Sequence, residues 1–365
     1  MNILRWVKLL GNPRRLCIEI LQKTNRLWPD RPYLQVYHWL MTGRKLDLEN
    51  PKTYSEKCQW MKLYYQKPEL TTMVDKYEAK KYVADRIGEQ YVVECYGVWD
   101  SFDDIDFSRL PNSFVLKCTH NSGSFAICKD KATFDIDKAR KKLEPWLKRN
   151  YYSKKREWVY KNVKPRIVAE KYMDSLGKPD SVEYKITCMG GVVQFVTICT
   201  GIAHAKYEER HNDHFSKEWE RLNWYARYKP TWKDYELTPE IKKMMELSEK
   251  LTQGIPQVRA DWYIHEGNIY FGELTFYTWA GWPVFTLEEW DYKLGENFIL
   301  PDKLYNFLKW LCLIVLPAVA VFIGVVFPVW DIPNADKIST TITALALLIG
   351  TCIGVSNSQY KKGGQ

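Results

Sequence analysis

The segment that decides the fold is residues 258–276, VRADWYIHEGNIYFGELTF. Two runs in which polar residues alternate with apolar ones, 257–264 and 269–276, flank a Glu-Gly-Asn turn at 266–268. Alternation on both sides of a short turn that contains Gly is typical of a β-hairpin. We therefore expect two antiparallel strands here, with one set of side chains on each face.

The hairpin carries a cluster of charged side chains. Asp261 and Glu273 fall on the two adjoining strands, and Arg259 and Thr275 lie two residues from each, on the same respective faces. Two carboxylates brought together repel each other unless a cation lies between them. Hard oxygen ligands favour Mg²⁺, which commonly bridges carboxylates to substrate phosphates. From the hairpin alone, a solvated face with an Arg–carboxylate pair remains the alternative.

A second segment has features of a phosphate site. The apolar run 114–116 ends in Lys117 and leads into Cys-Thr-His-Asn-Ser-Gly-Ser at 118–124. A lysine at a strand end supplies a point charge for phosphates, and a small Ser-Gly-Ser turn can aim backbone N–H groups at them. The segment lacks the GxxxxGK[ST] pattern of a Walker loop. A plain strand-to-turn connection is the alternative.

The rest of the chain predicts an α+β pattern without internal repeats. Helices are expected at 54–65, 74–87 and 136–149, strands at 91–98, 114–118 and 166–173, and a hairpin at 182–189 and 192–200 around Gly190-Gly191. The strands are antiparallel and carry alternating polar residues, so a regular βαβ repeat is not expected.

A series of short motifs follows in order along the chain. They are Thr53-Tyr54-Ser55-Glu56-Lys57, Gln59-Trp60-Met61-Lys62, Asp75-Lys76, Gly97-Val98-Trp99-Asp100, Leu110-Pro111, Phe114-Val115-Leu116-Lys117, Pro165-Arg166-Ile167, Glu170-Lys171-Tyr172, Asp180 with Tyr184-Lys185, Val258-Arg259-Ala260-Asp261 and Gly272-Glu273-Leu274-Thr275-Phe276. In this order they resemble the ATP-grasp enzymes, specifically the TupA-like branch named for teichuronopeptide biosynthesis. The resemblance covers about residues 33–282.

The resemblance implies roles for individual residues. Lys76 and Lys117 look like the two lysines that hold the ATP phosphates. The segment 119–125 looks like the flexible phosphate lid, which would contact ATP through Thr119, His120, Ser122, Gly123 and Ser124. The segment of Glu170, Lys171, Tyr172 and Met173 looks like the hinge that receives adenine through backbone groups and ribose through a carboxylate.

The same resemblance implies the catalytic and metal residues. Asp261 and Glu273 match the two acids that bridge Mg²⁺. Thr275 stands where many ATP-grasp enzymes have Asn, so a hydroxyl replaces the usual third metal ligand. Lys185 resembles a further basic contact in the cleft, and Arg259 is the residue expected to hold the reacting carboxylate or acyl phosphate, because its planar fork matches either.

The implied activity is that of an ATP-dependent carboxylate–amine ligase that forms an acyl phosphate and releases ADP and phosphate. Its expected cofactors are ATP and Mg²⁺. Its expected partners are an acidic glycan or lipid-linked sugar acceptor, an amino acid or amine, and polysaccharide-assembly proteins, at the inner face of a bacterial membrane. A phosphotransferase or glycosyltransferase with the same nucleotide cleft and a non-catalytic nucleotide-binding scaffold are the alternatives.

The acceptor region is less defined. Residues 204–235 are rich in aromatic and basic side chains, including Lys206, Arg210, Trp219, Trp224, Tyr225 and Arg227. Aromatic faces and cations fit an acidic sugar, and an aromatic-rich structural insertion is the alternative. His211 and His214 lie in a polar loop without further ligands, so we expect no zinc site there.

The end of the chain has the composition of a membrane segment. Residues 311–329 and 338–355 contain no charged residue, and each is long enough to span about 30 Å of hydrocarbon. The loop between them contains Asp331 and Asp336, whereas Lys303, Lys309, Lys361 and Lys362 flank the pair. This asymmetry places both flanks on the cytoplasmic side of the inner membrane. A buried helical hairpin in a soluble core is the alternative.

The complete expectation is an α+β protein with an ATP-grasp fold that holds the nucleotide between two α+β lobes, plus a C-terminal transmembrane hairpin. The expected parts are an N-terminal helical and α+β lobe (1–110), a lid subdomain (111–173), a catalytic lobe (174–303), and a transmembrane hairpin with a basic tail (304–365). The 365 residues carry 53 Lys and Arg against 44 Asp and Glu, a net charge of +9. The bases are scattered among acids and no nucleic-acid-binding motif is present, so nucleic acid is not an expected partner.

Overall fold

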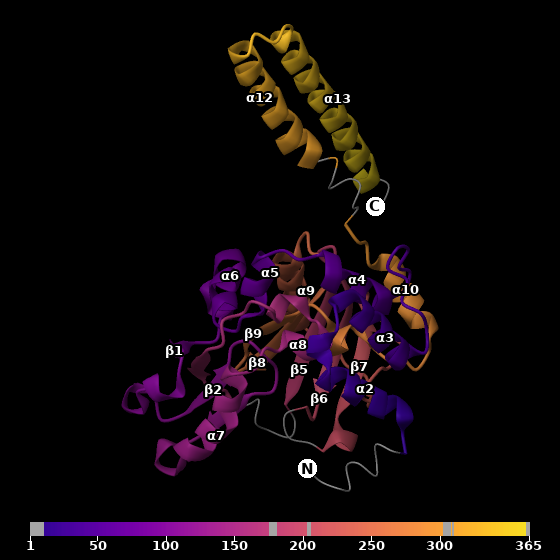
Figure 1. Ribbon diagram of the computed structural model, residues 1–365. Helices are drawn as coiled ribbons and strands as arrows, with labels where there is room; N and C mark the ends of the chain where they lie inside the picture. The colour runs from indigo at the N-terminus through magenta and orange to yellow at the C-terminus, as the bar shows by residue number, and fades with distance from the viewer. Residues whose placement is uncertain (1–10, 175–180, 203–205, 302–307, 309, 363–365) are drawn as a thin grey trace. The chain divides into compact units, whose positions relative to one another are not determined.

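The structure is a computed structural model that describes residues 11–174, 181–202, 206–301, 308 and 310–362. Two compact units divide the chain, unit 1 at residues 1–299 and unit 2 at residues 300–365 (Figure 1). Unit 1 contains two antiparallel sheets, and unit 2 contains a pair of helices.

The first sheet of unit 1 has the strand order β1-β4-β2-β3. Its strands are β1 (Cys95–Trp99), β2 (Phe114–Cys118), β3 (Phe125–Cys128) and β4 (Ile167–Lys171). Along β2 buried and partly buried residues alternate, so Phe114, Leu116 and Cys118 enter the core beneath helix α7 (Ile136–Leu147). The same alternation turns Lys117 to the opposite face.

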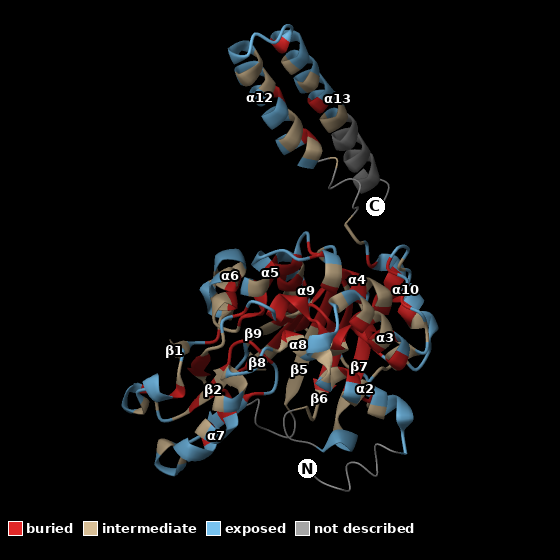
Figure 2. Ribbon diagram, viewed as in Figure 1, coloured by how far each residue is buried: buried red, intermediate tan, exposed pale blue. Residues whose placement is uncertain are grey.

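The second sheet has the order β7-β6-β5-β8-β9. Its strands are β5 (Val182–Met189), β6 (Val192–Thr200), β7 (His211–Ser216), β8 (Val258–His265) and β9 (Asn268–Thr275). Both predicted hairpins are confirmed, and their turns have the positive φ angles that favour Gly, at Gly190, Gly191 and Gly267. Helix α9 (Pro239–Thr252) packs on this sheet, and Figure 2 shows buried residues gathered on α9 and the strands around it.

Helices dominate residues 11–90 of unit 1. They are α2 (Pro13–Lys23), α3 (Asp30–Thr42), α4 (Tyr54–Tyr64), α5 (Glu69–Val74) and α6 (Glu78–Ile87). Thr53 and Glu56 form a capping box that begins α4, because each side chain accepts a backbone N–H of the other residue. Two further helices are α8 (Tyr152–Lys155) and α10 (Glu289–Asn297). Single 3₁₀ turns lie at Asn25–Leu27, Glu89–Tyr91, Phe102–Asp104, Phe107–Arg109, Lys131–Thr133, Trp158–Tyr160, Tyr207–Glu209 and Thr278–Gly281.

Two sequence-based boundaries were wrong. The expected helix at 74–87 is interrupted at Asp75, whose carboxylate accepts the backbone N–H groups of Tyr77 and Glu78 and pairs with Arg166 at 2.8 Å. An Asp that accepts N–H groups two and three residues on competes with helical hydrogen bonding, so α5 ends and α6 begins anew. The expected strand at 91–98 begins later, at Cys95, because residues 89–91 form a 3₁₀ turn.

Unit 2 is a helical hairpin of α12 (Leu316–Val329), preceded by a π-helical turn (Leu311–Val315), and α13 (Ala335–Lys362). The Ser339 hydroxyl on α13 donates to the Ala320 carbonyl on α12 at 2.9 Å. Within the described residues, one segment, Leu311–Val329, is long and apolar enough to cross a membrane. The second expected span is helical, but these criteria do not identify it as a membrane span.

Helix α10 is held to the start of α4 by one buried carboxylate. Asp291 is 3% exposed and accepts the backbone N–H of Ser55 at 2.8 Å and its hydroxyl at 2.7 Å. Arg44 donates to the same carboxylate and also to Glu288, whose side chain is 69% exposed. The buried carboxylate therefore joins three segments that are far apart in the sequence.

Asp291→Ala is expected to lower the free energy of unfolding of unit 1 by about 3 kcal/mol, because three donors lose a buried acceptor. Glu288→Ala removes an exposed partner of the same arginine and should cost less than about 1 kcal/mol. Denaturant unfolding followed by tryptophan fluorescence measures both. Equal losses in the two variants would contradict the assignment.

Candidate functional site

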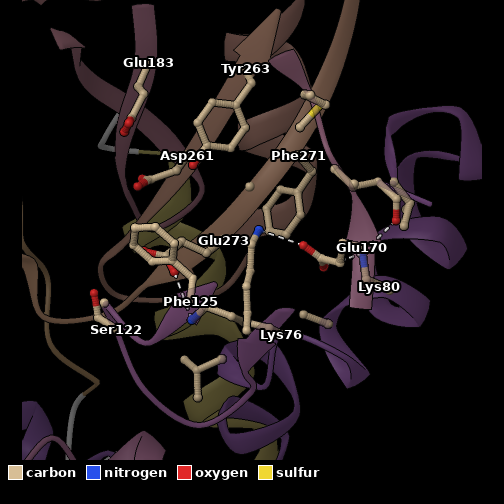
Figure 3. A pocket seen from close by; sticks show the side chains of 18 of the residues that line it. Lys76, Lys80, Ser122, Phe125, Glu170, Glu183, Asp261, Tyr263, Phe271 and Glu273 are labelled. Carbon is tan, nitrogen blue, oxygen red and sulfur yellow. Dashed lines mark hydrogen bonds and ion pairs between the residues drawn. The ribbon is translucent and has the colours of Figure 1, made fainter. Parts of the chain in front are cut away.

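A cavity of about 310 Å³ is lined by residues from both sheets of unit 1 (Figure 3). Its charged lining residues are Lys76, Lys80, Lys117, Glu170, Glu183, Lys185, Asp261 and Glu273. Apolar side chains from several elements complete the wall: Met73, Val74, Ala79, Val92, Val93, Met173 and Phe271. We call this space the first cavity. Its lining combines an apolar surface with opposite charges, as in sites for ligands that carry both a flat apolar part and an anionic part.

The carboxylate of Asp261 is the most enclosed charge of the first cavity. Asp261 is 1% exposed and lies at a β-bulge between Ala260 and Trp262. Arg259 donates Nε and Nη2 to its two oxygens at 2.6 and 2.7 Å. Lys185, directly opposite on β5, donates Nζ at 3.0 Å. Burial acts to raise the pKa of Asp261, but Arg259 and Lys185 lower it by a larger amount. The pKa therefore lies below its usual value, and the carboxyl stays ionised.

A second buried carboxylate holds two lysines on the opposite wall. Glu170, 5% exposed, pairs with Lys117 at 2.7 Å and with Lys80 at 2.8 Å. Burial acts to raise the pKa of Glu170, yet the lysines lower it to about 2. Both ammonium groups are thereby fixed at the edge of the first cavity.

Lys76 connects the phosphate-loop segment with the hairpin. Its Nζ donates to the Asn121 carbonyl at 2.7 Å and lies 3.3 Å from a Glu273 carboxylate oxygen. Its backbone N–H donates to the Thr119 carbonyl at 3.1 Å. The interruption between α5 and α6 is what places Lys76 here, since a continuous helix would engage the backbone N–H of Lys76.

The loop after β2 is divided between the cavity and the core. Ser122, Gly123 and Ser124 line the first cavity, and Gly123 has φ +87°, which favours glycine. Thr119 and His120 are buried instead and do not line the cavity. Thr119 donates its N–H to the Arg166 carbonyl, and His120 Nε2 lies 2.9 Å from the Trp146 carbonyl. Their contact with ATP stays a prediction.

The expected hinge is also divided. Glu170 and Met173 line the first cavity, whereas Lys171 and Tyr172 do not. The backbone N–H of Lys171 donates to the Glu94 carbonyl at 3.0 Å, as in a strand that continues the sheet. The adenine contacts expected of Lys171 and Tyr172 therefore stay a prediction.

A second cavity of about 320 Å³ shares Ser122, Lys185 and Glu273 with the first. Arg259 and Thr275 line it, together with the aromatic residues Tyr151, Tyr160, Phe195, Tyr228, Tyr277 and Trp279. The Tyr277 hydroxyl and Asn212 Oδ1, both buried on this lining, have no hydrogen-bond partner among the described residues. A polar ligand in the second cavity could satisfy both atoms.

The aromatic region 204–235 serves both structure and the second cavity. Arg227 and Tyr228 line the cavity, whereas Trp224 is 1% exposed and stacks on His214 with ring centroids 3.9 Å apart. Burial lowers the pKa of His214 to about 3, so this imidazole is neutral. Lys206, Arg210, Trp219 and Tyr225 do not line the cavity.

The donor set fits Mg²⁺ better than a soft metal. Asp261 and Glu273 offer carboxylate oxygens on one face of the hairpin, next to the cations that would contact phosphates. Among the described residues, no group of three or more His, Cys, Asp or Glu gathers as a closed metal cage. Thr275 Oγ1 accepts a hydrogen bond from Arg259 at 3.2 Å. The role of Thr275 as a third metal ligand stays a prediction.

Several lining residues were missed by the sequence reasoning. Lys80 lies four residues after Lys76, and Glu183 lies two residues before Lys185 on the same strand face and pairs with it at 2.9 Å. Helical and strand spacing were the available signals. Val92 had no signal, because an apolar residue beside a strand is most often core.

Several solved structures show low similarity to part of this chain. One is D-alanine–D-alanine ligase from Bacillus anthracis with ATP, with 16% identity over 60% of this chain and 57% of that chain and a TM-score of 0.34. Another is the ADP complex of purK, N5-carboxyaminoimidazole ribonucleotide synthetase, with 14% identity over 66% of this chain and 56% of that chain and a TM-score of 0.37. A third is the ATP-grasp ligase PsnB with Mg, ADP and a phosphomimetic variant of its minimal precursor (11%, 61% and 57%, 0.34). The chain thus spans less than three fifths of each of these proteins.

Unit 1 thus combines two antiparallel sheets and helices with a charged cavity lined by both sheets. A model of the TupA-like ATP-grasp family matches residues 56–299, so the chain belongs to that family. A model described as putative phage holin Dp-1 matches residues 300–362. No curated protein sequence matches the chain.

The pairing of Glu170 predicts a pH-dependent stability difference. Because its folded pKa lies below the usual 4.5, the pairing stabilises the fold above about pH 4.5 and is lost as pH falls towards 2. Glu170→Gln should lower the free energy of unfolding by about 3 kcal/mol at pH 7, and the difference from wild type should shrink below pH 4.5.

Denaturant titrations at several pH values measure this difference. Glu78→Gln is the control, since Glu78 also pairs with a cation, Arg166, but its side chain is 45% exposed. A Glu170→Gln difference that stays constant from pH 7 to pH 3 would show that the lysines do not hold this carboxylate ionised.

Proposed function

We propose that the protein is an ATP-dependent carboxylate–amine ligase that forms an acyl phosphate. The observation that carries this proposal is the position of Asp261 and Glu273 beside Lys76, Lys117 and Lys185 on the lining of one cavity. Membership of the ATP-grasp family supports an ATP-dependent ligase type of activity.

The first cavity receives ATP in this proposal. The apolar side chains of Val92, Val93, Met173 and Phe271 suit the faces of a purine, and the lysines suit the triphosphate. Before ATP binds, Glu273 and Glu170 hold the ammonium groups of Lys76 and Lys117 in place. When ATP binds, Lys76 leaves Glu273 and Lys117 turns from Glu170 towards the phosphates. The turn at Ser122, Gly123 and Ser124 contributes small residues that let the phosphates approach the backbone.

Asp261 and Glu273 are the residues that would hold Mg²⁺, which supplies charge neutralisation at the phosphates when bound. Asp261 is already ionised, so no proton has to leave it when a cation binds. Arg259 and Lys185 orient this carboxylate through three hydrogen bonds.

The second cavity receives the carboxylate substrate. A carboxylate oxygen attacks the γ-phosphorus, the bond to ADP breaks, and the acyl phosphate forms next to Arg259. The amine then attacks the acyl carbon, inorganic phosphate leaves, and the amine loses one proton as the amide forms. Arg259 lines this cavity, and its positive charge, held in place by Asp261, suits a carboxylate or an acyl phosphate. Exclusion of water protects the intermediate.

The finer proposal concerns the substrate and the location. We place the enzyme at the cytoplasmic face of a bacterial inner membrane, where it modifies a surface polysaccharide or its lipid-linked precursor with an amino acid or amine. The apolar segment Leu311–Val329 and the holin-like match support a membrane tether, and the second span at 338–355 is part of this proposal. The aromatic and basic lining of the second cavity, with Lys155 and Arg227, supports an acidic sugar.

Hydroxylamine trapping tests the proposed chemistry. Purified protein in detergent, given Mg-ATP, hydroxylamine and a panel of carboxylates that includes D-glucuronate and L-glutamate, should form a hydroxamate with equimolar ADP and phosphate. A stable phosphosugar would support a kinase instead. If no carboxylate of the panel supports ATP turnover, the result would favour a nucleotide-binding scaffold.

Glu273→Gln is expected to lower this turnover by at least about 100-fold, because it removes one of the two carboxylates beside the phosphates. Glu266→Gln makes the same chemical change at the tip of the same hairpin, where the side chain is 77% exposed, and should leave turnover unchanged. Full turnover in Glu273→Gln would remove the hairpin carboxylates from the mechanism.

The charge pattern around unit 2 predicts the orientation. Lysines at 303, 309, 361 and 362 flank the hairpin and its loop has Asp331 and Asp336, so unit 1 should face the cytoplasm. Added protease should leave unit 1 intact in right-side-out vesicles and digest it in inside-out vesicles. Digestion in right-side-out vesicles would overturn the orientation.

A further inference from the structure

A buried lysine lies behind the second cavity, outside the machinery described so far. Lys62, on helix α4, is 2% exposed. Its Nζ donates to Gln59 Oε1 at 2.8 Å, to the Ala280 carbonyl at 2.7 Å and to the Lys155 carbonyl at 3.0 Å. The three N–H groups of the ammonium are thus all used, and the same nitrogen lies 3.9 Å from the centre of the Trp282 ring.

The two carbonyls belong to two different segments that line the second cavity, which we call its two walls. Lys155, the last residue of α8, and Glu157 line it from one segment, and Thr278, Trp279 and Ala280 line it from the segment after β9. These walls are more than 100 residues apart in the sequence. Lys62 is therefore a single group that joins both walls from behind.

Both walls hold backbone that L-residues rarely adopt. Arg156 has φ +54°, and Trp279 and Ala280 have φ +51° and +59°, followed by Gly281 at φ +73°. Each non-glycine residue in this left-handed region costs about 1 kcal/mol and persists only when its surroundings hold it. A Cβ on Gly281 would lie 2.6 Å from Cys58 Cβ, so α4 approaches this wall closely.

The core alone does not account for a lysine here. Burial lowers the pKa of Lys62 to about 7, although Glu157 and Cys58 act to raise it, so the charged form is costly at this position. A methionine would fill similar space without that cost. What an apolar side chain could not do is donate to the two wall carbonyls.

We propose that Lys62 is a positioning residue that holds the two walls of the second cavity in the geometry that receives the carboxylate substrate. The inference rests on the proposed function for what occupies the cavity, but the coupling between the walls does not depend on catalysis. Gln59 assists, because its Nε2 donates to the Gly281 carbonyl at 2.7 Å.

Hydrogen–deuterium exchange on the full chain in detergent tests the coupling without any substrate. Lys62→Met should speed exchange about tenfold in two separate segments, 152–158 and 276–283, because each wall loses a hydrogen bond. Exchange in β2 and in β8 should stay as in the wild type. Binding of a fluorescent N-methylanthraniloyl ATP to the first cavity should change less than about twofold, since Lys62 does not line it.

Two further variants separate positioning from simple support of the fold. Lys57→Met changes another lysine of α4, whose Nζ donates to the Gly295 carbonyl at 2.8 Å, and should leave both walls unchanged. Lys62→Arg keeps the charge and the donors and should recover part of the protection in both segments.

The outcomes are distinct. The proposal is supported if Lys62→Met speeds exchange in both walls and nowhere else in unit 1, and if Lys62→Arg partly restores protection in both. It fails if exchange rises in one wall only, if it rises uniformly across unit 1, or if Lys62→Arg matches Lys62→Met. Because these measurements need no turnover, a failed hydroxamate assay would leave them informative.

Discussion

The structure of unit 1 depends on the pairing of carboxylates that are removed from water. Asp261 and Glu170 are each almost fully buried, and an isolated charge in such a position would cost several kcal/mol. Each carboxylate is satisfied by two cations, Arg259 and Lys185 for the first and Lys117 and Lys80 for the second. The pairs fix Lys117, Lys80 and Lys185 on the lining of the first cavity and Arg259 on the lining of the second.

These pairs also explain how a charged site can exist before its ligand binds. The ammonium groups of Lys76 and Lys117 face the cavity but already contact carboxylates, so an anionic ligand exchanges one partner for another. Strand register decides which groups meet, since Lys185 is opposite Asp261 across β5 and β8. Part of the second cavity is held differently, by hydrogen bonds from α4 to two segments that contain the left-handed residues Arg156, Trp279 and Ala280.

The local features of the fold could be predicted from the sequence. The hairpin around residues 266–268 follows from alternation and a glycine turn, and the ATP-grasp family follows from motifs in a fixed order. The helix break at Asp75 was missed, because the periodicity of 74–87 continues through it and the competing hydrogen bonds come from Asp75 itself, whose carboxylate also pairs with Arg166. Lys80 and Glu183 were missed because spacing alone does not tell a solvated charge from a paired one.

The sequence by itself determined the two hairpins and their turns, the family and an apolar segment at 311–329, because these depend on the pattern of neighbouring residues. It did not predict the strands β3 and β7, and His211 and His214, which were expected in a polar loop, lie in β7. Only the tertiary structure decided which residues share a cavity. Thr119 and His120 adjoin Ser122 in sequence yet lie in the core, whereas Lys62, Lys155 and Ala280 meet across more than 200 residues. The physical reason is that burial and ion pairing depend on contacts between distant segments, which local patterns do not encode.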